Sequence, residues 1–180
     1  MHPIRLATII AATTFVATNP AAAQAEPTTV FVVRHAEKGP ETPDPDLTAL
    51  GIARAKALAH LLMDAKVTAI FTSEFKRTQQ TAVPLATELH LTPEVIGAGK
   101  VDELVGRLRS LPSGSRALVV SHSNVVPVIV EKLSGQKVGE LTDSDYDRIY
   151  AVILGPDGKA VVLYLHFGAP SAGNGGTMRP

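Results

Sequence analysis

Short runs of consecutive apolar residues alternate along the chain with longer stretches in which apolar residues recur every three or four positions. Runs of about four to eight apolar residues are typical of buried strands, and the longer period is typical of amphipathic helices. The pattern predicts strands at residues 29–33, 67–72 and 117–121, and helices at residues 46–66, 76–89, 100–111 and 124–133. This alternation indicates an α/β domain, a three-layer αβα sandwich with a mainly parallel sheet.

Local signals refine the ends of these elements. Asp46 is placed to cap the first helix. The sequence Pro-Ser-Gly at residues 112–114 ends the third helix. Residues 148–154 and 159–167 flank the turn Gly-Pro-Asp-Gly and predict a β-hairpin at one edge of the sheet. The sequence shows neither an internal repeat nor a second domain.

The two ends of the chain differ in composition from the domain between them. Residues 1–25 begin with a short basic segment, continue with an apolar run and close on Ala-Gln-Ala, the order of a secretory signal peptide cleaved after Ala25. The alternative, an uncleaved anchor helix, is disfavoured because the apolar run is too short to span a bilayer. We therefore expect an exported protein, periplasmic or secreted, with a domain at residues 26–167 and without stable membrane insertion after cleavage. Residues 168–180 are rich in Gly, Ser and Pro and predict a disordered tail.

Composition excludes several classes of function. The chain has no cysteine, so disulfides, thiolate catalysis and lipoprotein anchoring are excluded. Its 17 Lys and Arg residues balance 17 Asp and Glu residues and are scattered, so no nucleic-acid-binding surface is predicted. The oligomeric state cannot be inferred from composition.

Arginine and histidine side chains follow the three apolar runs. Arg34 and His35 come directly after the first strand, Arg77 follows the second at the start of its helix, and His122 follows the third. Open α/β sheets bind anions at the carboxyl ends of parallel strands, beside helix N-termini. Taken singly, each arginine would be interpreted as solvated and each histidine as structural. Four such residues at one sheet edge favour a shared anion pocket. The remaining histidines of the domain are interpreted as structural or surface residues: His60, His90 and His166.

Three motifs occur in order: Arg-His-Ala at residues 34–36, residues 73–82 around Arg77, and residues 120–124 around His122. Together they resemble the histidine phosphatase superfamily, which includes cofactor-dependent phosphoglycerate mutases. The resemblance covers about residues 29–167, and Ala36 stands where many members have glycine. It implies a phosphoglycerate mutase-like fold and a small, exported, branch 1-type phosphatase acting on a small phosphorylated substrate.

The resemblance also implies roles for the pocket residues. Neutral His35 would attack phosphorus and form a phosphohistidine that water then hydrolyses. Arg34 and Arg77 would bind the nonbridging oxygens through paired hydrogen bonds, and His122 would donate to the phosphoryl group in the transition state. Ser123, with Asn124, would either contact phosphate or cap the following helix. No metal and no cofactor is required for this chemistry.

A general acid for the leaving group is not evident. Relatives carry a glutamate or aspartate after the second arginine or directly after the second histidine, where this chain has Ser123. The candidates are Glu37, Asp102 and Glu103, although a solvated surface role is favoured over catalysis for each. Further carboxylates could lie near the pocket or on its rim: Glu94, Asp143, Asp145 and Asp147. Without an acid, acyl phosphates, phosphoramidates and aryl phosphates would be favoured over sugar phosphates.

Three other functions are compatible with the motifs. A noncatalytic phosphate- or phosphoglycan-binding module would keep the pocket without forming a phosphohistidine. A mutase is disfavoured because the chain has little sequence for a lid. An enzyme acting on envelope phosphates is permitted by the signal peptide. The loop at residues 37–46 is either part of the pocket rim or a plain connection, and it would set specificity together with residues 91–101.

Overall fold

The computed structural model describes residues 25–40 and 43–171, so residues 1–24, which carry most of the predicted signal peptide, lie outside the described part. None of the helices within these ranges is both long enough and apolar enough to cross a membrane. The elements follow the chain in the order β1 Thr28–Arg34, α1 Ala49–Leu62, β2 Ala69–Thr72, α2 Lys76–Glu88, β3 Glu94–Val95, α3 Val101–Arg109, β4 Arg116–Ser121, α4 Val126–Ser134, β5 Arg148–Leu154 and β6 Ala160–His166.

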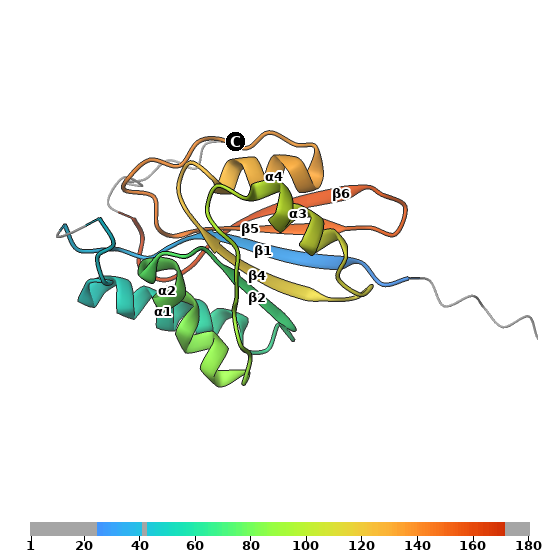
Figure 1. Ribbon diagram of the computed structural model, residues 1–180. Coiled ribbons are helices and arrows are strands. Elements are labelled where there is room, and N and C mark those ends of the chain that lie inside the picture. The colour runs from blue at the N-terminus through green and yellow to red at the C-terminus, as the bar shows by residue number, and fades with distance from the viewer. Residues whose placement is uncertain (1–24, 41–42, 172–180) are drawn as a thin grey trace, which may run out of the picture.

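A six-stranded sheet in the order β3-β2-β4-β1-β5-β6 forms the middle layer. Strands β3, β2, β4 and β1 run parallel to one another, whereas β5 is antiparallel to both β1 and β6. Helices α1 and α2 cover one face of the sheet and α3 and α4 cover the other (Figure 1). The predicted three-layer αβα sandwich and its edge hairpin are therefore confirmed.

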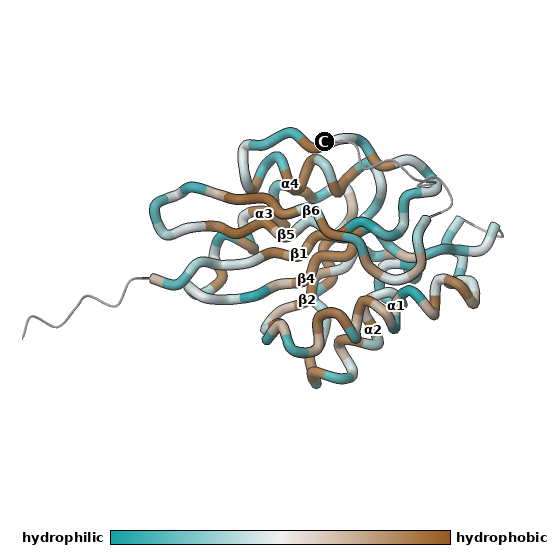
Figure 2. The backbone as a smooth tube through the Cα atoms, turned by 180° about the vertical axis from the view of Figure 1, so that it is seen from behind, coloured by the Kyte–Doolittle hydropathy of each residue, from teal (hydrophilic) through white to brown (hydrophobic). Residues whose placement is uncertain are grey.

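Two apolar cores, one on each face, explain the unbroken apolar runs in the sequence. Val30 and Val32 of β1 pack towards α3 and α4, whereas Val33 packs towards α1 and α2. Strand β4 divides its side chains in the same way between the two cores. Because both faces of these central strands are buried, apolar residues are needed at every position, and the strands are brown along most of their length in Figure 2.

The first helix begins later than predicted. Thr48, not Asp46, caps it, because the Thr48 hydroxyl accepts a hydrogen bond from the Gly51 amide at 3.1 Å. Asp46 instead accepts a hydrogen bond from the Gln80 side chain of α2 at 2.8 Å. Asp46 therefore connects the loop before α1 to helix α2. Strand β3 is an addition that the sequence pattern did not predict, since it contains only Glu94 and Val95.

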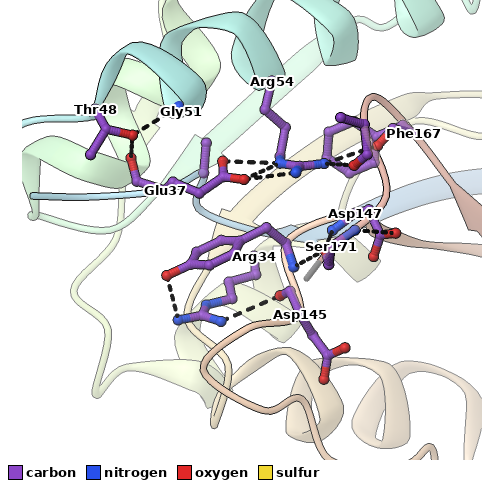
Figure 3. A network of polar contacts seen from close by, with 12 residues as sticks. Arg34, Glu37, Thr48, Gly51, Arg54, Asp145, Asp147, Phe167 and Ser171 are labelled. Atoms are coloured by element: carbon purple, nitrogen blue, oxygen red, sulfur yellow. Dashed lines mark hydrogen bonds and ion pairs between the residues drawn. The ribbon is translucent and has the colours of Figure 1, made fainter. Parts of the chain in front are cut away.

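The segment after β6 departs from the predicted tail. Ser171 is only 5% exposed, and its hydroxyl accepts hydrogen bonds from the Tyr146 and Asp147 amides at 2.8 and 3.0 Å. Its own amide donates to the Asp147 carboxylate (Figure 3). The prediction that residues 168–180 are disordered is thus wrong for residues 168–171, which the domain holds through backbone groups. Residues 172–180 lie outside the described residues.

Candidate active site

The carboxyl ends of β1 and β4 bring the two histidines together. Arg34 and Ser121 are partners in the parallel ladder, and the His35 amide continues the ladder by donating to the Ser121 carbonyl at 2.8 Å. The next residue of each strand therefore leaves the sheet at the same point, and the His35 and His122 ring centroids lie 5.4 Å apart. Strand register alone juxtaposes two residues that are far apart in sequence.

His35 presents an unprotonated nitrogen to the site. Its Nδ1 lies 2.8 Å from the Ala36 carbonyl oxygen, which can only accept, so Nδ1 carries the hydrogen and Nε2 keeps its lone pair. Burial lowers the pKa of His35 to about 3, with further lowering by the nearby Arg34, against the opposing effect of the Ala36 hydrogen bond. The imidazole is therefore neutral throughout the physiological range of pH.

Arg34 is held in place by a segment near the end of the domain. Its Nη1 donates to the Thr142 carbonyl at 2.8 Å and to the Asp145 carbonyl at 3.3 Å. Its Nη2 donates to the Tyr146 hydroxyl at 3.3 Å, and the guanidinium lies 4.0 Å from the centre of the Tyr146 ring (Figure 3). Tyr146 could not be identified from the sequence, because a tyrosine among three aspartates indicates no contact with a strand more than 100 residues away.

Arg77 approaches from the start of α2, directly after the loop that follows β2. The Asp44 carboxylate fixes this helix end by accepting from the Lys76 amide at 3.0 Å, and it lies 3.6 Å from Arg77 Nη1. The guanidinium stacks on the Phe75 ring at 4.2 Å. Like Arg34, Arg77 has a buried Nε–H without a hydrogen-bond partner. A buried guanidinium N–H group is expected to have an acceptor, so these two atoms are exceptions within the described part of the chain.

His122 contacts groups from three directions. Its Nε2 lies 2.9 Å from the Ser73 hydroxyl, and its Nδ1 lies 3.5 Å from Arg77 Nη2. The Phe75 ring meets the imidazole edge-on, with the centroids 5.2 Å apart. Burial lowers the pKa of His122 to about 4, assisted by Arg77 and opposed by Glu74. Ser73 was not identified from the sequence.

An open cavity of about 450 Å³ joins these groups, and all four predicted residues, Arg34, His35, Arg77 and His122, line it. Ser123 and Asn124 also line the cavity. Helix α4 begins at Val126 without a side-chain cap, so the alternative that Ser123 or Asn124 caps it is wrong. Lys38, in the loop after β1, and residues 98 and 99, after β3, also line the cavity.

The structure places none of the three predicted general acids in the cavity. Glu37 turns away from it and forms a buried pair with Arg54 of α1, with Oε1 2.7 Å from Nη2 (Figure 3). Asp102 pairs with Lys132 and Glu103 pairs with Lys100, both at the surface of the molecule. None of these three candidates for the general acid lines the cavity, and each pairs with a basic residue elsewhere.

Of the other candidate carboxylates, one lines the cavity and the rest contact residues outside it. Asp143 is the one carboxylate among the described residues that lines the cavity; it is fully exposed and lies 3.7 Å from Arg34 Nη2. Asp145 is buried and accepts hydrogen bonds from the Thr142 amide and hydroxyl, both at 2.7 Å. Asp147 binds Ser171, and Glu94 pairs with Arg107. Across residues 25–40 and 43–171, no group of three or more His, Asp or Glu residues is arranged to hold a metal ion.

Comparisons with known proteins agree with this geometry. Residues 30–98, which include Arg34, His35 and Arg77, match the model of the histidine phosphatase superfamily (branch 1). A PE-PGRS family protein of Mycobacterium tuberculosis is 47% identical over 55 residues, which are 30% of this chain and 9% of that protein. The match therefore spans less than a tenth of that relative's length.

Solved structures share the fold over most of the described domain. The protein histidine phosphatase SixA complexed with tungstate superposes with a TM-score of 0.65 and 23% identity, covering 77% of this chain and 96% of that chain. A phosphoglycerate mutase from Plasmodium falciparum superposes with a TM-score of 0.58 and 18% identity, covering 81% and 95%. The architecture is thus a phosphoglycerate mutase-like α/β fold.

Proposed function

We propose that the chain, whose residues 30–98 match the histidine phosphatase superfamily (branch 1), is a hydrolase that cleaves phosphomonoesters without a metal, through a phosphohistidine on His35. One observation carries the proposal. Neutral His35 shares a cavity with the guanidinium groups of Arg34 and Arg77. A phosphoryl group supplies the electrophile for His35 Nε2 and the hydrogen-bond acceptor for the two guanidinium groups.

The side chains define the steps of the reaction. A bond forms between His35 Nε2 and phosphorus while the bond from phosphorus to the leaving oxygen breaks, and the electron pair departs with that oxygen. Arg34 and Arg77 stabilise the charge that spreads over the nonbridging oxygens. Water then attacks the phosphohistidine and releases phosphate, which restores neutral His35. The hydrogen bond from Nδ1 to the Ala36 carbonyl keeps the ring orientation constant in both steps.

The carboxylates limit the choice of substrate. Asp143, which lines the cavity, is fully exposed and lies beside Arg34, so the described residues place no buried carboxylic acid near the leaving group. We therefore expect aryl phosphates, acyl phosphates and phosphoramidates to be cleaved faster than alkyl phosphates, because an alkoxide leaves poorly without a proton. The protein histidine phosphatase with the same fold supports a phosphoramidate substrate class.

Hydrolysis of p-nitrophenyl phosphate in the presence of a chelator tests the proposal. The wild type should be active, and His35→Ala should lose activity to the background of the assay. His60→Ala is the matched control, since His60 lies on α1 away from the cavity. A rate for p-nitrophenyl phosphate no greater than that for glycerol 3-phosphate would contradict the leaving-group argument. Activity that survives in His35→Ala would refute the proposed nucleophile.

The noncatalytic phosphate-binding module stays a second candidate, and the absence of a buried carboxylic acid from the described cavity favours it. Such a protein would bind inorganic phosphate but would not hydrolyse any of the three favoured substrate classes. A folded wild type that binds phosphate, forms no phosphohistidine with acetyl phosphate and releases no product would establish this second function.

We also propose that the chain is exported, on the support of the N-terminal composition. Cleavage after Ala25 would leave the domain intact, because β1 begins at Thr28 and the Glu26 carbonyl accepts hydrogen bonds from the Gly114 amide and the Ser113 hydroxyl. Expression of the full chain followed by mass spectrometry of the purified protein tests this. A mature N-terminus at Glu26 is expected, and an intact Met1 in a cytoplasmic fraction would contradict it.

A further inference from the structure

A buried pair of hydroxyl groups supports His122 on the side away from the cavity. Ser73 follows β2, and its Oγ lies 2.9 Å from His122 Nε2 and 3.0 Å from Thr78 Oγ1. Thr78, in the first turn of α2, lies 2.7 Å from the Phe75 carbonyl oxygen. Ser73 is 3% exposed and Thr78 is completely buried, so water does not compete for these contacts.

The neighbouring carbonyl groups favour one direction for the hydrogens of these contacts. Thr78 Oγ1 lies 2.7 Å from the Phe75 carbonyl oxygen and 3.1 Å from the Ser73 carbonyl oxygen, and because both oxygens can only accept, the Thr78 hydroxyl hydrogen is directed to one of them. The contact between the two hydroxyl groups must then use the hydrogen of Ser73. Ser73 has no second hydrogen, so His122 Nε2 must carry one and donate it to Ser73. The lone pair of the neutral ring is left on Nδ1, where Arg77 Nη2 approaches at 3.5 Å.

The two histidines of the cavity are thus opposite tautomers. His35 is protonated on Nδ1 and His122 on Nε2. Neutral His122 consequently has no hydrogen to donate to a phosphoryl oxygen, and it becomes a donor only when Nδ1 gains a proton. The charged and titratable groups that face the ring are Arg77, Arg34, His35 and Glu74, and only Glu74 favours the proton. A bound phosphoryl dianion would offset the two arginines.

We propose that Ser73 and Thr78 are positioning residues that hold His122 as the Nε2–H tautomer, so that the cavity binds a phosphoryl dianion together with one proton from solvent. That proton is shared between His122 Nδ1 and a phosphoryl oxygen, and no other bond forms or breaks. The inference rests on the proposed function only in taking a phosphoryl group as the ligand. The affinity of the cavity for the ligand should then fall about tenfold per pH unit above the highest pKa of the ligand, because the free ligand has lost its own proton there.

Proton uptake measured by titration calorimetry tests this, with phenylphosphonate as a ligand that cannot be hydrolysed. Binding to the full chain is measured at pH 8 in buffers of different ionisation enthalpy. The wild type should take up about one proton per ligand. Thr78→Val frees the Ser73 hydrogen to donate to His122 Nε2, which moves the ring hydrogen to Nδ1, so uptake should fall towards zero. Thr78→Ser keeps the hydroxyl and should retain the uptake of the wild type.

Two further variants locate the proton. Ser73→Ala removes the acceptor for Nε2–H and should also lower uptake, whereas His122→Asn should abolish it while leaving some binding. Equal uptake in His122→Asn and the wild type would place the proton elsewhere and refute the inference. Equal uptake in Thr78→Val and Thr78→Ser would show that the hydroxyl chain does not set the tautomer.

Nitrogen-detected NMR of the imidazole rings provides a readout that is independent of activity. At pH 7 the wild type should show a slowly exchanging Nε2–H for His122, which Thr78→Val loses and Thr78→Ser keeps. Phosphonate binding with proton uptake but without hydrolysis of any phosphate ester would uphold the inference and refute the phosphatase function. A folded wild type that binds no phosphonate would overturn both.

Discussion

Replacement of Glu37 distinguishes a structural carboxylate from a catalytic acid. Arg54 Nε and Nη2 donate to Glu37 at 2.7 to 3.0 Å, and the two side chains are only 2% and 14% exposed. Arg54 Nη1 also donates to the Phe167 and Ala169 carbonyl groups at 3.2 and 2.8 Å. Glu37→Ala therefore leaves a buried guanidinium without its counterion, which typically costs about 3–5 kcal/mol.

This loss is large enough to measure in several ways. At about 2–4 °C per kcal/mol for a domain of this size, the melting temperature should fall by roughly 6–20 °C. Urea unfolding followed by far-UV circular dichroism suits a chain without tryptophan. The double variant Glu37→Ala/Arg54→Ala should lose less than the sum of the two single losses, with a coupling of up to about 3 kcal/mol. Asp102→Ala is the matched control, because its pair with Lys132 is exposed and should contribute less than about 1 kcal/mol.

Activity measured well below the melting temperature separates the two roles. Glu37→Gln keeps the shape of the side chain and should retain kcat for p-nitrophenyl phosphate within about threefold, because Glu37 does not line the cavity. Loss of a general acid would lower kcat by about 10²–10⁴-fold for a substrate that needs protonation of its leaving group. A Glu37→Gln variant with wild-type stability and a hundredfold lower kcat for an alkyl phosphate would refute the structural interpretation.

Three further outcomes are expected. Arg77→Lys should lower kcat/KM by about 10- to 150-fold in steady-state assays, the equivalent of one charge-assisted hydrogen bond, because an ammonium group cannot make the paired hydrogen bonds of a guanidinium; a loss below threefold would contradict this. Acid should destabilise the fold, because His35 and His122 have depressed pKa values of about 3 and about 4. The unfolded chain binds protons first, so stability is complete above about pH 6.5 and falls by ~1.4 kcal/mol per pH unit for each histidine below it; urea unfolding at pH 5 and pH 7 should show a smaller difference for His35→Gln than for the wild type. Gly51→Ala should lower the melting temperature, since an added Cβ would overlap the Glu37 carbonyl oxygen, whereas Gly106→Ala on α3 meets open space and should gain about 0.5–1 kcal/mol; equal melts would show that the Gly51 contact relaxes.

The elements that could be predicted are those whose cause is local. Strands β1 and β4 are buried on both faces, so their sequences are continuous apolar runs, and the helices show the period of their buried stripes. Strand β3 could not be predicted, because its two residues pair with β2 and carry no period of their own. The start of α1 was missed because Asp46 and Thr48 are both good caps, and the contact of Asp46 with Gln80 decides between them.

The candidate site also contains some residues that could be predicted from the sequence and others that could not. Arg34, His35, Arg77 and His122 could be located because each follows a strand, and parallel strands end at one edge of the sheet. The general acid could not be located from the sequence, because closeness in sequence does not indicate where a side chain points. Glu37 is two residues from His35 but faces Arg54. The tail was misassigned for a related reason, since the polar composition around Ser171 hides the backbone hydrogen bonds that hold it.

The sequence by itself therefore determined the layers of the fold, the four pocket residues and the absence of thiol chemistry, because these depend on composition and on periods within single elements. The tertiary structure decided which groups are partners: Ser73 with His122, Tyr146 with Arg34, and Glu37 with Arg54. Those contacts join residues 17 to 112 positions apart. They set the tautomer of His122, the position of Arg34 and the place of a buried ion pair, because a hydrogen bond depends on distance and direction in space, which no local pattern encodes.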